Sequence, residues 1–354
     1  MTTVPAEDPQ HADTTAARTE MIPYDAKAWA SVERWRERRL EREARGLLPG
    51  AWRERANRAS RAAREKLEAL PGSERFEKLF LDALRGLTDL GARAARASVH
   101  REAVLRAYRK QGYAVDTLGD IRQVSLRDID KVMPRLDLAY IVSSTLEGAV
   151  AGLVVSGGQL LAAGGVLGAG AGAAPGAGAV VGAMAADAAA VLFASHRVVA
   201  HIAAYYGYDV EDPQEQLFAL GVLGVGTAAG AGKAAAYVEL NKLVQGLARR
   251  QAWKQLNRNA VTRTVSRVYA TLGMRLTQRK LAQAVPVAGI VIGAGLNARL
   301  LANIADDAHH LYRERFLREK YGLEQDLDSR AVGSPDAVKV ADILDAEIVD
   351  EHER

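Results

Sequence analysis

The chain has 354 residues, a formal net charge of +4 and a hydrophobic fraction of 49%, enough to bury a core in one large or two ordinary domains. It contains no cysteine, which excludes disulfides, cysteine-ligated zinc, iron–sulfur clusters and a thiol nucleophile. Alanine is abundant and aromatic residues make up only 6%, a composition that favours an all-α fold.

The first part of the chain is highly charged. Residues 1–22 lack the basic and apolar regions of a secretory signal, so we expect a disordered leader and a cytoplasmic protein. Residues 23–112 are predicted to form a charged helical region. Its first helix, Asp25–Arg45, carries a thin apolar stripe made of Trp29, Val32, Trp35 and Leu40.

Residues 113–322 are predicted to form the helical core. Tyr113–Gln123 is expected to be a connector, and Ser125 with Asp128 has the spacing of a capping box that starts the next helix. That helix runs into Gly148–Ala186, thirty-nine residues with twelve glycines and no charged side chain. We predict that this segment forms a central glycine-rich helical hairpin.

The glycines of this segment suggest how its helices pack. In a helix, residues four apart share a face, so glycines at that spacing allow two backbones to approach closely. The predicted helix-contact residues with this spacing are Gly164, Gly168, Gly172 and Gly176, and further along the chain Gly289 and Gly293. Three interpretations are open: a buried helical pair in a soluble bundle, a hairpin that inserts into a membrane, or a flexible linker.

Asp187 ends the uncharged run, and a buried aspartate must be paired or protonated. The candidate partners are Lys233, an arginine of the later basic segment, Asn297 or a helix N-terminus. Asp187 is therefore either a structural polar contact or a proton or ligand site.

Three later helices have clear boundaries. Ala188–Tyr206 is predicted to end at Gly207, and Asp212 with Pro213 is a strong helix start. That helix enters a second glycine run, Gly221–Ala236. A third small-residue segment leads into a polar helix that ends at Tyr321 and Gly322.

Charge is distributed unevenly over the second half of the chain. Leu240–Ala305 has eleven Lys and Arg residues and no acidic residue. Part of it is predicted to form a basic amphipathic helix, which fits an anionic membrane surface, although a solvated helix face is an open alternative. The lipid-binding candidates are Arg250, Lys254, Arg258, Arg263 and Arg267. No nucleic-acid-binding motif accompanies these cations, so we expect no nucleic-acid partner.

A search for catalytic groups gives one weak candidate. Asp306 and His310 share a helix face and could supply two metal ligands, but the sequence offers no motif for a third. Polar residues at the edge of a packed helix are the simpler interpretation. We therefore predict no catalytic residues, no metal and no cofactor.

Several segments together resemble the bacterial EcsC protein family. The matching features are Glu147-Gly148, the glycine run that ends at Asp187, the turn formed by Tyr206, Gly207 and Asp209 with Pro213 after it, and Pro286, Gly289 and Gly293 followed by Asn297. The resemblance covers about Glu65–Gly322. The family is named for a gene that neighbours an ABC transporter, and it implies no catalytic residues.

These observations predict a non-enzymatic, membrane-associated accessory protein at the inner face of the cell membrane. Its expected partners are an anionic membrane surface and a membrane protein or transporter subunit. The alternatives are a soluble helical scaffold that binds a protein such as a transporter subunit, and an unrecognised metal-dependent hydrolase. Residues 323–354, with ten acidic and three basic residues, are predicted to form a partly disordered tail.

Overall fold

The structure is a computed structural model. It describes residues 20–42, 101–134, 177–228, 231–249, 263–265, 267–269, 271–273, 291–323, 339–340 and 343. The regular elements among these residues are helices, and none of these residues lies in a β-strand. The predicted all-α, multi-helix fold is therefore confirmed for the part of the chain that the structure describes.

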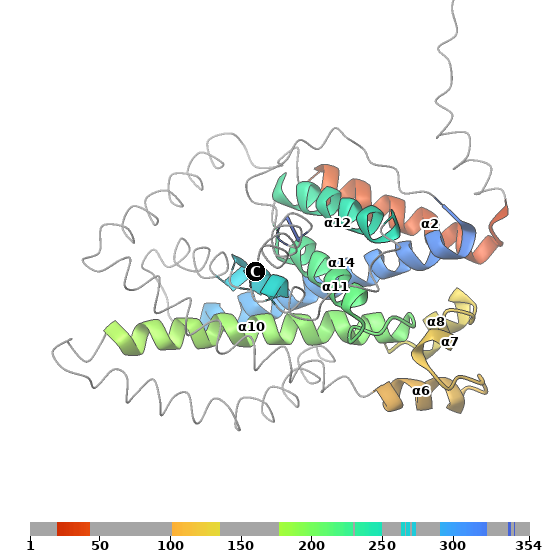
Figure 1. Cartoon of the computed structure of the whole chain (residues 1–354), viewed down its shortest axis with the longest axis horizontal. Coiled ribbons are helices and arrows are strands. Elements are labelled where there is room, and N and C mark those ends of the chain that lie inside the picture. The colour runs from red at the N-terminus through yellow and green to blue at the C-terminus, as the bar shows by residue number, and fades with distance from the viewer. Residues whose placement is uncertain are drawn as a thin grey trace, which may run out of the picture.

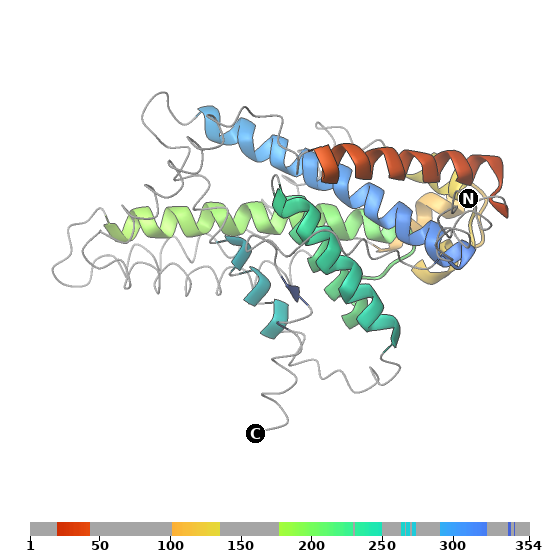
Figure 2. The same ribbon diagram turned by 90° about the horizontal axis from the view of Figure 1, so that it is seen from above.

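Two long helices form the framework of the molecule. Helix α10 (Ala177–Tyr205) packs along α14 (Val291–Tyr321), and the N-terminal ends of both helices lie at the same end of the molecule (Figures 1 and 2). Helix α10 starts earlier than the expected Ala188. Alanine favours the helix, and valine and leucine side chains from Val191 onward supply a buried face.

Helices α11 (Pro213–Thr227) and α12 (Ala231–Arg249) form a helical hairpin beside this pair. The predicted start of α11 is confirmed, because Asp212 is the N-cap and its Oδ1 accepts a hydrogen bond from the backbone N–H of Gln214 at 2.9 Å. Leu240 and Leu243 of α12 are buried in the core, as their helical spacing predicted.

A glycine of the second glycine run allows α11 to approach α14 closely. A Cβ atom added at Gly226 would lie 3.0 Å from Ile304 Cγ1 and 3.3 Å from Ile304 Cα. A side chain at this position would therefore push the two helices apart. The absence of a side chain at Gly226 thus allows α11 and α14 to pack closely.

The N-terminal helix packs on the outside of α14. Helix α2 (Pro23–Arg36) continues directly into a π-helical turn, η1 (Glu37–Arg42), and the two together contact α14, α12 and α8 (Figure 2). The four residues of the predicted apolar stripe, from Trp29 to Leu40, are all buried. The π-helical turn shifts the register of the helix, so that Leu40 and Arg39 both reach toward the core.

A group of short helices closes the other end of α10. These are α6 (Arg101–Lys110), α7 (Leu118–Ile121) and α8 (Leu126–Val132). The expected connector thus contains the helix α7, which the Asp120 carboxylate stabilises by accepting a hydrogen bond from the Thr117 N–H at 2.7 Å. At α8, Ser125 caps the helix by accepting a hydrogen bond from the Asp128 N–H at 3.3 Å.

Gly207 ends α10 in a backbone conformation that favours glycine. Its φ is +84°, and an added Cβ would lie 2.7 Å from the carbonyl oxygen of Leu118. The chain therefore turns tightly against α7 at this point. Most of the predicted glycine-rich hairpin, including Gly164, Gly168, Gly172 and Gly176, lies outside the described residues.

Candidate functional site

The buried polar contacts of the described structure gather along the C-terminal half of α14. Partner side chains come from α2, η1, α8, α11 and α12, so this half of α14 connects five other described helices. The sequence of α14 explains why. Core-facing positions three and four residues apart carry charges between apolar residues, in the order Ile304, Asp307, Leu311, Glu314 and Arg318.

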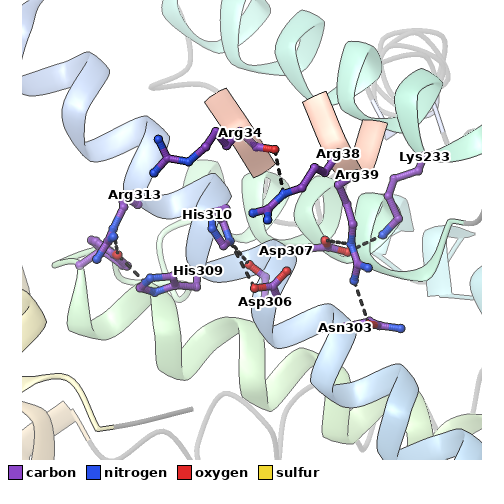
Figure 3. A network of polar contacts seen from close by, with 11 residues as sticks. Arg34, Arg38, Arg39, Lys233, Asn303, Asp306, Asp307, His309, His310 and Arg313 are labelled. Atoms are coloured by element: carbon purple, nitrogen blue, oxygen red, sulfur yellow. Dashed lines mark hydrogen bonds and ion pairs between the residues drawn. The ribbon is translucent and has the colours of Figure 1, made fainter. Parts of the chain in front are cut away.

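Asp307 lies at the centre of the first cluster and is fully buried. Its Oδ1 accepts a hydrogen bond from Arg39 Nε at 3.0 Å, and its Oδ2 accepts one from Lys233 Nζ (Figure 3). Arg39 also donates to Asn303 Oδ1 through Nη2 at 2.9 Å. One carboxylate thus connects η1, α12 and α14 through two charge-assisted hydrogen bonds.

Glu314 lies at the centre of the second cluster, seven residues after Asp307 in α14. Its Oε1 accepts hydrogen bonds from Tyr237 Oη at 2.7 Å and from Arg318 Nη2 at 2.8 Å, and lies 3.7 Å from Arg36 Nη2. Burial raises the pKa of Glu314, but Arg36 and Arg318 outweigh burial and hold it below its usual value. The Glu314 carboxyl group is therefore ionised in the core.

Arg315 anchors the N-terminal end of α11. Its guanidinium donates two parallel hydrogen bonds to Glu215, Nη1 to Oε2 at 2.6 Å and Nη2 to Oε1 at 2.7 Å. The same guanidinium carbon lies 4.4 Å from the ring centres of Tyr208 and Phe218. This pair fixes the helix start that the sequence predicted at Asp212 and Pro213.

A pocket of about 340 Å³ opens between the end of α8 and the middle of α14. Met133, Pro134, Ala302 and Ala305 supply its apolar lining. Asp130, Asp306, His309 and Arg313 supply its polar groups, three of them from one face of α14.

The polar groups of the pocket belong to one hydrogen-bonded chain. Asp130 accepts a hydrogen bond from Tyr24 Oη at 2.7 Å through Oδ2 and forms an ion pair with Arg313 through Oδ1. Arg313 Nε donates to Tyr206 Oη at 3.2 Å, and this hydroxyl lies 3.3 Å from His309 Nδ1. We assign the Tyr206 proton to His309 Nδ1, since the Tyr206 oxygen already accepts from Arg313, and in this tautomer the ring proton of His309 is on Nε2.

Burial, together with Arg313 and His310, lowers the pKa of His309 well below its usual value. The imidazole is therefore neutral near pH 7. On the opposite face of α14 from Asp307, His309 and Arg313 point toward one another (Figure 3). The pocket thus combines fixed hydrogen-bond donors and acceptors with an apolar wall.

The structure assigns local contacts to the two residues considered as metal ligands. His310 Nδ1 lies 2.8 Å from the backbone oxygen of Asp306 and 3.5 Å from its Oδ1, and the His310 ring stacks on Trp35 with ring centres 5.2 Å apart. No group of three or more His, Asp or Glu side chains arranged to hold a metal ion occurs among the described residues.

The predicted turn residues have structural contacts. Tyr206 is buried beneath the pocket, and Gly207 makes the tight turn described above. Asp209 Oδ1 accepts a hydrogen bond from the Glu211 N–H at 3.0 Å and lies 3.2 Å from Arg101 Nη2, which ties the turn to α6.

Other predicted residues lie partly or wholly outside the described part. Asp187 and Asn297 fall in α10 and α14, but nothing of their side chains is described. Lys233, a suggested partner of Asp187, forms a buried ion pair with Asp307. The predicted contact residue Gly293 falls in α14, whereas Pro286 and Gly289 lie outside the described residues.

Of the lipid-binding candidates, Arg263 and Arg267 fall in short helical pieces, and Arg267 is exposed. Arg250, Lys254 and Arg258 lie outside the described residues. In the part of the chain that the structure describes, no helix combines the length and the apolar character needed to cross a membrane.

Sequence reasoning missed Asp130, Arg313 and Arg39. Asp130 and Arg313 are separated by 183 positions, and Arg39 and Asp307 by 268. Short-range spacing does not reveal such pairs. The usable signal was Asp307 itself, a charged residue three positions after Ile304 and four before Leu311 in a core-facing row.

Comparison with known proteins gives two matches. The sequence profile of the EcsC protein family matches residues 27–317. The chain is also 28% identical over 207 residues to "Uncharacterized protein YdbA" of Bacillus subtilis (strain 168), and the match covers 58% of this chain and 64% of that protein. No solved structure matches. Since the family profile covers most of the chain, from α2 to the end of α14, this protein belongs to the EcsC protein family.

Proposed function

We propose that this protein is a non-enzymatic, helical accessory protein that attaches to the inner face of the cell membrane. Attachment uses two features of the chain: a charge-poor end of the helical framework, and the basic segment that follows α12. The paired ends of α10 and α14 are the observation that carries this proposal.

The two long helices are strongly asymmetric in charge. Residues 177–196 of α10 contain one charged residue, Asp187, and residues 291–305 of α14 contain one, Arg299. By contrast, α14 has eight charged residues between Asp306 and Tyr321. Because the helices pack along each other with their N-termini at one end, the charge-poor halves lie together (Figures 1 and 2).

Such an end is suited to the boundary between lipid headgroups and acyl chains. Small apolar residues are favourable there, and few charged groups need to be desolvated. Alanine and glycine give little hydrophobic energy per residue, so this end alone would bind weakly.

The basic segment supplies the second contribution. Its eleven cations without an acidic residue fall between Leu240 and Ala305, directly before and within the charge-poor half of α14. A Lys or Arg near an anionic leaflet contributes about 1 kcal/mol at moderate ionic strength. The five lipid-binding candidates together therefore contribute more binding free energy than the small apolar side chains of the charge-poor end.

Vesicle flotation tests the proposal directly. Purified full-length protein is mixed with vesicles of phosphatidylglycerol and phosphatidylcholine or of phosphatidylcholine alone, and floated at low and high salt. We expect binding to the anionic vesicles only, with most of the protein released at high salt. Protein that stays unbound on both vesicle types overturns the proposal and favours a soluble scaffold.

A matched pair of variants locates the contact. One variant replaces Arg250, Lys254, Arg258, Arg263 and Arg267 with glutamine, and we expect a loss of vesicle affinity of more than a hundredfold. The control removes the same charge from exposed positions elsewhere, namely Lys27, Arg34, Arg106, Lys110 and Arg127. An equal loss in both variants would mean that net charge, rather than the basic segment, drives binding.

A further inference from the structure

The pocket between α8 and α14 holds polar groups that are fixed in place before any ligand arrives. Arg313 is held between Asp130 and Tyr206, and Tyr206 also orients the His309 ring. These side chains come from α8, α14 and the turn that follows α10, and Tyr24 of α2 adds a hydrogen bond to Asp130. Groups that are already oriented lose little entropy on binding, which is typical of ligand sites.

The pocket offers both donors and acceptors. His309 presents Nε2–H, since its Nδ1 faces Tyr206. Arg313 uses Nε and Nη2 for its bonds to Tyr206 and Asp130, and its remaining N–H groups add to the donors. The acceptors are the carboxylates of Asp130 and Asp306.

The charges in the pocket do not cancel. Arg313 neutralises Asp130, and His309 is neutral. Asp306 has a half-exposed side chain, 51%, and no Lys or Arg ion pair among the described residues. One carboxylate therefore remains for a cationic group, beside donors that suit an anionic group.

We propose that this pocket binds a compact zwitterion, a molecule with an ammonium group and a carboxylate or phosphate a few bonds apart. The ammonium contacts Asp306, the anionic group contacts His309 Nε2–H and Arg313, and the aliphatic part rests against Met133, Pro134 and the two alanines. A volume of about 340 Å³ has room for such a compact ligand, with a few carbon atoms between the charged groups.

Two sources share this chemistry: free ω-amino acids and the ethanolamine phosphate headgroup of a lipid. Isothermal titration of the full-length protein with β-alanine, γ-aminobutyrate, δ-aminovalerate and glycerophosphoethanolamine distinguishes them. Ethylamine, acetate and inorganic phosphate serve as probes with a single charged group. We expect at least one zwitterion to bind about tenfold or more tightly than any of these three.

Two variants test the location of the site. Asp306→Asn removes a charge that has no Lys or Arg ion pair among the described residues. Asp306 is exposed, so the fold is retained, and we expect a loss of zwitterion affinity of about tenfold or more. Ala302→Leu fills the apolar side of the pocket and is expected to lower the affinity for every zwitterion. The matched control is Asp116→Asn, at a side chain that is 99% exposed and outside the pocket.

The outcomes separate cleanly. Loss of binding in Asp306→Asn and Ala302→Leu, with Asp116→Asn unchanged, supports the proposal and identifies the preferred source by the tightest probe. No binding of any zwitterion, equal binding of a probe with one charged group, or binding that survives both pocket variants overturns it. None of these results depends on vesicle binding, so the membrane proposal stands or fails separately.

Discussion

The buried carboxylate of Asp307 allows a sharp test of the packing between α12, α14 and η1. Its two oxygens accept from different cations, Oδ1 from Arg39 and Oδ2 from Lys233. Asp307→Asn keeps the size of the side chain but replaces one oxygen with an NH2 group. Whichever way the amide turns, it directs a donor at one of the two cations.

The expected cost follows from burial. The Asp307 side chain is 0% exposed and that of Lys233 is 4% exposed, so the ammonium group loses its anion without gaining water. Removing one partner of a buried ion pair costs about 3–5 kcal/mol of unfolding free energy. Arg39 is 23% exposed and keeps its hydrogen bond to Asn303, so losing the Arg39–Asp307 ion pair adds little to the cost in unfolding free energy.

Urea unfolding followed by helical circular dichroism measures this cost. Asp307→Asn is expected to lower the free energy of unfolding by at least about 3 kcal/mol, and the exposed control Asp116→Asn by less than about 0.5 kcal/mol. The double variant Lys233→Met with Asp307→Leu removes both charges and is expected to recover most of the loss. A loss below about 1 kcal/mol in Asp307→Asn would refute the assignment of a buried, doubly paired carboxylate.

Three further predictions concern single positions. Gly207→Ala is expected to cost about 1–3 kcal/mol of stability, since φ is +84° and the new Cβ meets Leu118 O at 2.7 Å; Gly112→Ala, with φ +88° and open space, is expected to cost only about 1 kcal/mol in the same urea assay. Gly224→Ala adds a methyl group where nothing lies within 4 Å and is expected to raise the free energy of unfolding by up to about 1 kcal/mol. Burial, with Arg197, lowers the pKa of His201 to about 4, so as the pH falls the unfolded chain binds a proton here before the folded protein does. The free energy of unfolding is therefore expected to fall by about 3 kcal/mol between pH 6.5 and 4. In His201→Gln, the dependence of the unfolding free energy on pH over this range is expected to be weaker.

The sequence predicted those features that depend on neighbouring residues. The start of α11 follows from Asp212 and Pro213, and the ends of α10 and α14 follow from Gly207 and Gly322, both with positive φ. These signals act within a turn or two of helix. They therefore do not depend on residues that are distant in the sequence.

The contacts around α14 were beyond such reasoning, because they join residues far apart in the chain. Arg39 reaches Asp307 only because η1 shifts the register of the first helix by a π-helical turn, and no local pattern in that segment predicts the shift. The Asp130–Arg313 pair depends on how α8 packs against α14. The sequence indicates that Asp307 is a charged residue in a core-facing row, but it does not indicate which residue pairs with it.

The polar row on α14 has a role that its contribution to stability does not explain. Alanine and glycine interfaces, such as that between Gly226 and Ile304, offer few protruding side chains to fix how far one helix slides along another. Paired charges at Asp307 and Glu314 do fix this, because each is satisfied in one register only. We therefore expect the double variant Lys233→Met with Asp307→Leu to remain stable but to occupy more than one register, seen as multiple methyl resonances for Ile304. A single sharp resonance at the wild-type position would show that the Asp307–Lys233 pair is not needed to specify the packing, and that shape and the Glu314 contacts are sufficient.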